Sequence, residues 1–223
     1  MRRLIVCLGV MALSAPAYAL DPKPPVGIDP GLEPVAILTT GIDYTDPVIA
    51  KRLARDGEGE PIAWDFVDGD TRPFAASPNT TAANWGGDGT VFMRRLLAHS
   101  GMPRHSIIAV RINPADPASL ARALLFVSQT RATQVAVPMW SQEAGDWEPL
   151  RLTAQRLPGL ILSVPECVLP TPGVPQFPVH FGLATIKRLS REDRDLHGLD
   201  AALLAVCQGA SGAAVEVAPP LAN

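Results

Sequence analysis

Apolar and polar positions along the chain follow two periods, one typical of strands and one typical of helices. Short apolar or β-branched runs predict buried strands, and stretches with apolar residues three or four apart predict helices. The predicted strands cover 35–38, 61–67, 106–112, 134–139, 160–164 and, more weakly, 181–186. The predicted helices cover 48–53, 90–100, 117–131 and 147–156. Strands and helices therefore alternate over most of the chain.

This alternation indicates the fold class. A helix between two strands allows a crossover connection, which places parallel strands in one sheet with helices on both faces. We therefore expect an α/β fold, a three-layer α/β/α arrangement with a mainly parallel sheet. Two helices carry clear start signals, because Asp46 precedes Pro47 and Asp116 precedes Pro117. The charged segment 187–195 is assigned to neither a helix nor a strand.

The first residues are typical of a signal peptide, which we assign to 1–19. Arg2 and Arg3 precede an apolar run at 4–15 that is too short to span a bilayer, and 17–19 reads Ala-Tyr-Ala, a typical cleavage signal. We expect an exported protein, periplasmic or secreted, that does not span the membrane after cleavage. An uncleaved N-terminal anchor is the alternative.

The remainder divides into a leader and one domain. Residues 20–34 are rich in proline and have little periodicity. We expect them to be extended, either strapped over the surface or loose. Residues 35–223 have the length of a single domain.

The composition of the chain argues against nucleic acid as a binding partner. The 19 Lys and Arg residues against 22 Asp and Glu residues give a formal net charge of −3, and aromatic residues make up only 5%. Neither value fits a nucleic-acid-binding surface. With 47% hydrophobic residues the chain is expected to fold rather than to remain disordered.

The two cysteines outside the signal peptide and the acidic turn each allow two interpretations. No cofactor is predicted. Cys167 and Cys207 form either a disulfide or two buried thiols, and no histidine cluster accompanies them to suggest zinc. The acidic turn of Asp65, Asp68 and Asp70 is either a calcium site or, more commonly, a solvated turn. We assign no metal site.

Four segments occur in an order that points to one family. Residues 35–47 read VAILTTGIDYTDP, 64–70 read WDFVDGD, 87–90 read GDGT, and 209–218 read GASGAAVEVA. They resemble, in order, the first catalytic strand, the following strand and acidic turn, the start of the active-site helix, and the nucleophile segment of subtilisin-like serine proteases (subtilases). The resemblance implies a subtilisin-like domain that is shortened at its C-terminus.

The resemblance also assigns three catalytic positions, two of them to unexpected residues. Thr39 stands at the position of the family's aspartate, Asp88 at that of its histidine, and Ser211 at that of its serine. Thr39 carries no charge to stabilise an imidazolium, and a carboxylate is a weak base toward a serine hydroxyl at neutral pH. An alternative for Asp88 is a turn residue or a helix N-cap.

Residues at the family's oxyanion and substrate positions also differ. The segment 160–167 places Cys167 where the family has an asparagine, next to Glu166, and the segment 139–142 lacks the family's glycine. The resemblance therefore implies an exported peptidase-family domain, catalytically degenerate, with a role in binding a peptide or protein or in regulation. An active or residual serine endopeptidase that uses Ser211 is the alternative. A subunit that completes the sheet of another chain is a third possibility.

Overall fold

A computed structural model describes residues 21–75, 88–99, 102, 105–138, 148–157, 159–165, 185–189 and 198–211. Several predictions fall outside these residues: the signal peptide, the segment 139–142, Glu166 with Cys167, and the part of the proposed nucleophile segment after Ser211. Of the stretch 74–87, which has no periodicity and is predicted to be a loop, residues 76–87 also lie outside them. The same holds for the proposed pairing of Cys167 with Cys207.

Within the described residues, six strands form one parallel sheet, which confirms the predicted α/β class. They lie in the order β2-β3-β1-β4-β5-β6, and every neighbouring pair is parallel. The longest pairing joins β1 to β3, from Glu33 beside His105 to Thr39 beside Arg111. The strands are β1 (Glu33–Thr39), β2 (Ala63–Asp65), β3 (His105–Arg111), β4 (Gln134–Ala136), β5 (Ile161–Pro165) and β6 (Thr185–Leu189).

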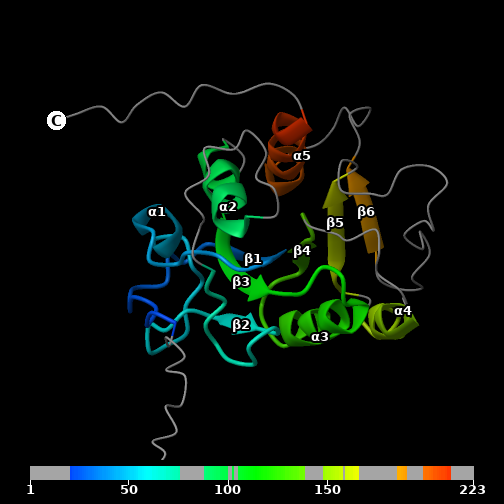
Figure 1. Cartoon of the computed structure of the whole chain (residues 1–223), viewed down its shortest axis with the longest axis horizontal. Helices are drawn as coiled ribbons and strands as arrows, with labels where there is room; N and C mark the ends of the chain where they lie inside the picture. The colour runs from blue at the N-terminus through cyan, green and yellow to red at the C-terminus, as the bar shows by residue number, and fades with distance from the viewer. Residues whose placement is uncertain are drawn as a thin grey trace, which may run out of the picture.

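Helices cover both faces of this sheet (Figure 1). One face carries α1 (Pro47–Ala50), α2 (Gly89–Ala98) and α5 (Gly198–Ser211), and the other carries α3 (Pro117–Ser128) and α4 (Glu148–Ala154). Successive residues of β1 alternate between the two layers: Val35 and Ile37 pack toward α2, whereas Ala36 and Leu38 pack toward α3. A strand covered on both faces is apolar throughout, which explains its continuous apolar run.

The predicted helix starts are correct where a local signal exists. The side chain of Asp46 accepts a hydrogen bond from the Val48 N–H at 2.8 Å, and that of Asp116 accepts one from the Ala118 N–H at 2.9 Å. Each acid therefore acts as the N-cap of a helix that begins with proline. The helix predicted at 48–53 is shorter than expected, because α1 ends at Ala50.

Two assignments near the C-terminus were wrong. The sequence pattern indicated no helix at 198–211, where α5 lies. This stretch is rich in alanine and leucine, both strong helix formers, so intrinsic propensity favours it. The charged segment from 187 onward begins inside β6. This strand lies at one edge of the described sheet, and charged residues are well suited to sheet edges.

The described part of the leader lies against the domain. The Tyr44 hydroxyl donates to the carbonyl oxygen of Pro22 at 2.6 Å, and the Ser106 hydroxyl donates to that of Leu32 at 3.1 Å. The leader was expected to lie either over the surface of the domain or loose, and its described residues lie over the surface.

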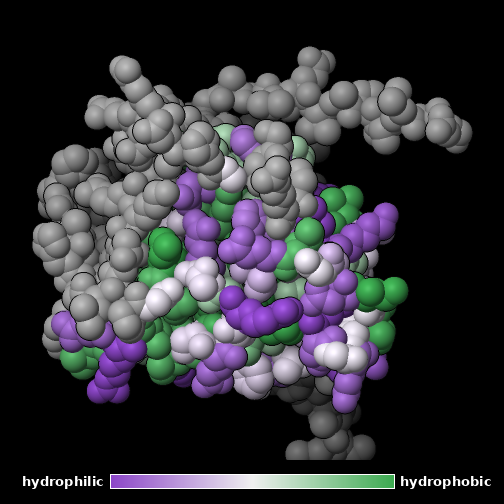
Figure 2. Space-filling model, turned by 180° about the vertical axis from the view of Figure 1, so that it is seen from behind, coloured by the Kyte–Doolittle hydropathy of each residue, from purple (hydrophilic) through white to green (hydrophobic). Residues whose placement is uncertain are grey.

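Exposed apolar side chains are spread over separate elements. Figure 2 shows the face opposite to that of Figure 1, where apolar groups of the described residues occur in small sets between polar ones. The larger exposed ones include Val48, Leu125 and Leu152, on three different helices. Within the described residues, no helix has both the length and the apolar character needed to cross a bilayer.

Candidate functional site

The carboxyl ends of β1, β2 and β3 form the candidate site. Thr39, Arg111 and Asp65 are register partners in one row across these strands. The strand order changes direction at β1, because β3 and β2 lie on one side of it and β4 to β6 on the other. In open parallel sheets, sites form outside the carboxyl ends of the strands at such a change of direction.

Thr39 ends β1 in a buried position, 2% exposed. Its hydroxyl oxygen accepts a hydrogen bond from the Gly41 N–H at 3.2 Å. Gly41 has a φ of 114°, a value that side chains rarely allow. The turn after β1 thus uses the Thr39 hydroxyl to hold its own backbone.

Asp88 is the N-cap of α2. Its carboxylate accepts hydrogen bonds from the Thr90 N–H at 2.9 Å and the Val91 N–H at 3.2 Å. The N-cap alternative for Asp88 is therefore confirmed as a description of what this side chain does.

The start of α2 lies directly against the end of β1. A Cβ atom at Gly89 would lie 2.1 Å from the Gly41 carbonyl oxygen and 2.9 Å from Cβ and Oγ1 of Thr39. The Asp43 N–H also donates to Oγ1 of Thr90 at 2.8 Å. The structure therefore brings the segments of Thr39 and Asp88 together, although they are distant in sequence.

Ser211 is the last residue of α5, a helix that packs against α2 and β5. Its side chain falls outside the described part of the structure. For Ser211, the proposed nucleophile position, the structure therefore gives only the position of the backbone at the end of α5.

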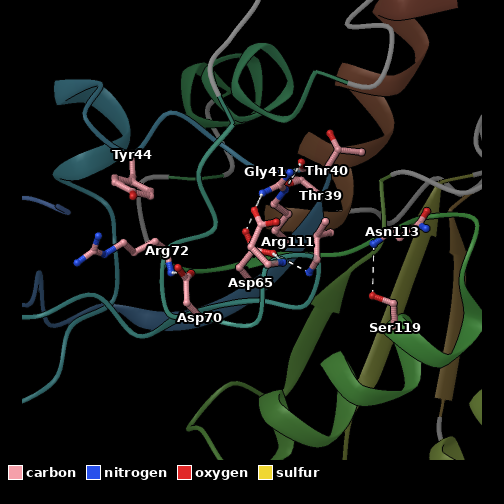
Figure 3. A network of polar contacts seen from close by, with 12 residues as sticks. Thr39, Thr40, Gly41, Tyr44, Asp65, Asp70, Arg72, Arg111, Asn113 and Ser119 are labelled. Carbon is pink, nitrogen blue, oxygen red and sulfur yellow. Dashed lines mark hydrogen bonds and ion pairs between the residues drawn. The ribbon is translucent and has the colours of Figure 1, made fainter. Parts of the chain in front are cut away.

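An ion pair between the buried Asp65 and the half-buried Arg111 holds the ends of the three strands together (Figure 3). Asp65 is fully buried, and its second carboxylate oxygen lies 2.9 Å from Nη1 of Arg111. Nη1 of Arg111 also contacts the carboxylate of Asp68, and Nε donates to the carbonyl oxygen of Thr40 at 3.1 Å. Burial alone would lower the pKa of Arg111, but its hydrogen bond to Asp65 and the charges of Asp65 and Asp68 outweigh burial and raise it.

The contacts of Arg111 involve two of the three acids of the acidic turn, which the sequence offered as a calcium site or a solvated turn. Carboxylate oxygens of Asp21, Asp65 and Asp68 lie within 4.8 Å of one another, close enough to hold a cation. The guanidinium of Arg111, however, contacts both Asp65 and Asp68 and supplies the positive charge there. The remaining acid of the turn, Asp70, accepts from the Arg72 N–H at 2.7 Å. Each acid of the turn therefore has a partner within the protein: Asp65 and Asp68 contact Arg111, and Asp70 accepts from the backbone.

The described histidines lie away from this edge. His99 is the C-cap of α2, and His105 is the first residue of β3, at the opposite end of its strand from Arg111. His180 and His197 lie outside the described residues. Within the part of the chain that the structure describes, no histidine stands beside Asp88 at the start of α2.

A second polar cluster, between β5 and α5, was missed by the sequence analysis. The buried Ser163 hydroxyl donates to the Asp200 carboxylate at 2.8 Å, and the Gln134 amide donates to both Ser163 at 2.8 Å and Asp200 at 2.7 Å. A serine inside an apolar strand is the one signal that pointed to it. Ser163 is fully buried and Asp200 is 6% exposed, so the cluster anchors α5 to the sheet.

The sequence was also compared with known proteins. No protein-family model matches the chain, and no curated protein matches it. The resemblance to subtilases therefore rests on the four motif segments and on the positions of the residues within them.

Proposed function

We propose that the chain is an exported protein with a subtilisin-like scaffold that has lost proteolytic chemistry and serves in binding or regulation. The order of the four motif segments along an alternating strand and helix pattern is the first support. The parallel sheet with helices on both faces is compatible with this scaffold.

The contact between Thr39 and the Asp88–Gly89 segment is the observation that carries the proposal. A catalytic set requires its members to be neighbours in space, whatever their separation in sequence. Two positions that were named from motifs alone lie at the same edge, where Gly89 allows the two backbones to approach. A coincidental match of short motifs gives no reason for this contact.

The chemistry at these positions supports a degenerate site. Serine proteolysis needs a base that takes the hydroxyl proton and a charged group that orients this base. Thr39 is uncharged and holds the turn at Gly41, and the Asp88 carboxylate caps α2. Loss of base and orienter removes a factor on the order of 10⁶ from the rate of such enzymes.

Activity-based labelling tests the loss of catalysis. We expect the purified chain to remain unlabelled by a fluorophosphonate probe, which reacts with activated serines, and to leave casein intact. Labelling that disappears in Ser211→Ala would overturn the proposal in favour of a serine endopeptidase.

A double variant tests the assigned positions. Thr39→Asp with Asp88→His introduces the residues that the family has at both positions, and we expect it to gain labelling that Ser211→Ala abolishes. Thr40→Asp with Asp88→His is the matched control, because it adds the same charge one residue away. A double variant that folds by circular dichroism but stays unlabelled would contradict the placement of Ser211 at the nucleophile position.

Export is tested separately. N-terminal sequencing of the protein recovered from the periplasm or the medium of an expressing bacterium should begin at Leu20. A cytoplasmic protein with an intact N-terminus would contradict export.

A further inference from the structure

The described part of the leader, residues 21–32, contains no helix or strand. Prolines stand at 22, 24, 25 and 30, and each fixes its own φ and favours an extended conformation of the residue before it. Such a sequence favours the polyproline II conformation, whose backbone makes no internal hydrogen bonds and leaves its carbonyl groups available.

Three side chains of the domain bind carbonyl oxygens of residues 21–25. Nη1 of Arg72 donates to the carbonyl of Asp21 at 3.1 Å, the Tyr44 hydroxyl donates to that of Pro22 at 2.6 Å, and Nη1 of Arg55 donates to that of Pro25 at 2.7 Å. Figure 3 shows Tyr44 and Arg72 near one another, away from Arg111. Main-chain recognition of this kind depends on the path of the peptide and little on its side chains.

One proline ring provides the apolar contact. Pro24 is buried, and it lines the same apolar pocket as Tyr44, Leu53, Pro61 and Pro73. In contrast, Val26 is 61% exposed and Ile28 is 93% exposed. Residues 21–25 are therefore held mainly by their carbonyl groups and by Pro24, while the apolar side chains of Val26 and Ile28 contribute little. Further along, the Gly27 N–H donates to the Gly59 carbonyl at 3.1 Å, and the Asp29 carboxylate accepts from the Arg55 N–H at 3.2 Å.

The domain itself holds the binding side chains in place. Arg55 is 5% exposed and donates to the carbonyls of Gly59 at 2.8 Å and Ala50 at 3.1 Å in addition to Pro25. The ring of Tyr44 packs edge-on against Phe74, with 5.3 Å between the ring centroids. Donors that are positioned in advance lower the entropic cost of binding a peptide.

We propose that this surface, formed by Tyr44, Leu53, Arg55, Pro61, Arg72 and Pro73, is a binding site for a proline-rich peptide in the polyproline II conformation. We call it the leader groove. The chain's own residues 21–25 occupy it, and a proline-rich segment of another protein binds there when the leader is released. Carbonyl recognition beside an aromatic ring and a proline pocket is a known physical mode of polyproline binding.

Occupation by the leader regulates the groove. A tethered segment acts at an effective concentration on the order of millimolar, so a free peptide competes poorly with it. This proposal depends only on contacts of the leader and does not require the subtilase assignment.

The experiment uses the full chain with residues 21–26 replaced by a glycine–serine segment of equal length. The probe is a fluorescent peptide of residues 20–28, and binding is followed by fluorescence anisotropy. We expect the peptide to bind the replaced chain at least tenfold more tightly than the unaltered chain. A peptide with Pro22, Pro24 and Pro25 changed to alanine keeps the charges, and we expect it to bind at least tenfold more weakly.

Variants in the domain locate the binding. In the replaced chain, Tyr44→Phe removes one hydrogen bond to a carbonyl and should weaken peptide binding about fivefold, within the range that a single hydrogen bond supports. Arg122→Ala, a change at an exposed arginine of α3, is the matched control and should leave binding unchanged.

Each outcome decides the proposal. A folded replaced chain that does not bind the peptide would overturn it, and so would equal binding of the alanine peptide. If the replaced chain does not fold alone, recovery of its circular dichroism signal on adding the peptide supports the proposal, and failure to recover overturns it. Fluorophosphonate labelling is independent of these results, so the two proposals fail separately.

Discussion

Asp65 and Arg111 are register partners on adjacent parallel strands, and their side chains form an ion pair of 2.9 Å inside the fold. The other oxygen of Asp65 accepts hydrogen bonds from the N–H groups of Val67 at 2.7 Å and Asp68 at 2.9 Å. Arg111 in turn binds the Thr40 carbonyl after β1. This pair therefore joins the ends of β1, β2 and β3, where the candidate site lies.

Replacing Arg111 should strongly destabilise the protein. Arg111→Met leaves the carboxylate of Asp65 buried without its cation, which should lower the free energy of unfolding by about 3–5 kcal/mol. Arg122→Met is the matched control, because Arg122 and its partner Asp116 are 57% and 40% exposed and such a pair contributes about 0–1 kcal/mol. Urea unfolding measures both values. Equal losses in the two variants would contradict a structural role for the buried pair.

A methyl group at Gly89 should separate β1 from α2. Alanine is the better helix former, but its Cβ would lie 2.1 Å from the Gly41 carbonyl oxygen, so the clash decides the sign. We expect Gly89→Ala to lower the free energy of unfolding by about 1–3 kcal/mol. Gly57→Ala, where a Cβ meets nothing within 4 Å, should be near neutral. Thermal unfolding of both proteins checks this; a Gly89→Ala protein as stable as Gly57→Ala would show that the two segments lie further apart.

Removal of the Asp200 carboxylate should loosen α5. Asp200→Ala leaves the Ser163 hydroxyl and the Gln134 amide without this acceptor between β5 and α5. Because hydrogen bonds to charged groups are the stronger kind, we expect a loss of about 2–3 kcal/mol. The exposed Ser128→Ala change also removes a hydrogen bond, to the Leu125 carbonyl, yet should cost no more than about 0.5 kcal/mol. Hydrogen exchange within α5 should increase in Asp200→Ala, and unchanged protection would argue against this anchoring.

Ionisation of Asp21 should weaken the attachment of the leader. Burial first, and then the neighbouring carboxylates of Asp70 and Asp68, raise the pKa of Asp21 above its ordinary value. The folded state therefore binds this proton more tightly than the unfolded state. The resulting stability is present below the ordinary pKa of about 4 and is lost as the pH rises through the raised pKa.

Asp21→Asn removes this penalty at neutral pH. We expect its melting temperature at pH 7 to exceed that of the unaltered protein by on the order of 1 °C, since solvent screens much of the effect, and the difference should vanish near pH 3. Glu58→Gln controls for the loss of one negative charge at an exposed position. The same gain at both pH values would refute the electrostatic explanation.

Features that depend on neighbours in sequence were predicted well. The apolar run of β3 and the Asp-Pro starts of α1 and α3 are local, and the structure has them where the sequence indicated. Strand bounds were less accurate: β2 was predicted at 61–67 and covers only Ala63–Asp65. β2 ends beside Arg111, the last residue of β3, and before Ala63 the edge of β3 is paired with Leu53 at Ile107 instead. Both partners are distant in sequence from β2 or outside its pattern, so no local signal gives these bounds.

In the candidate site, too, local features could be predicted from the sequence and long-range contacts could not. The sequence by itself determined the fold class and named Thr39 and Asp88, because motif residues and N-caps are read from adjacent positions. Only the tertiary structure decided that Gly89 lies against Thr39, that Arg111 pairs with Asp65 and Asp68, and that the leader lies against Tyr44. These contacts depend on strand order and on the register of β1, β2 and β3, which long-range packing sets and no local pattern encodes.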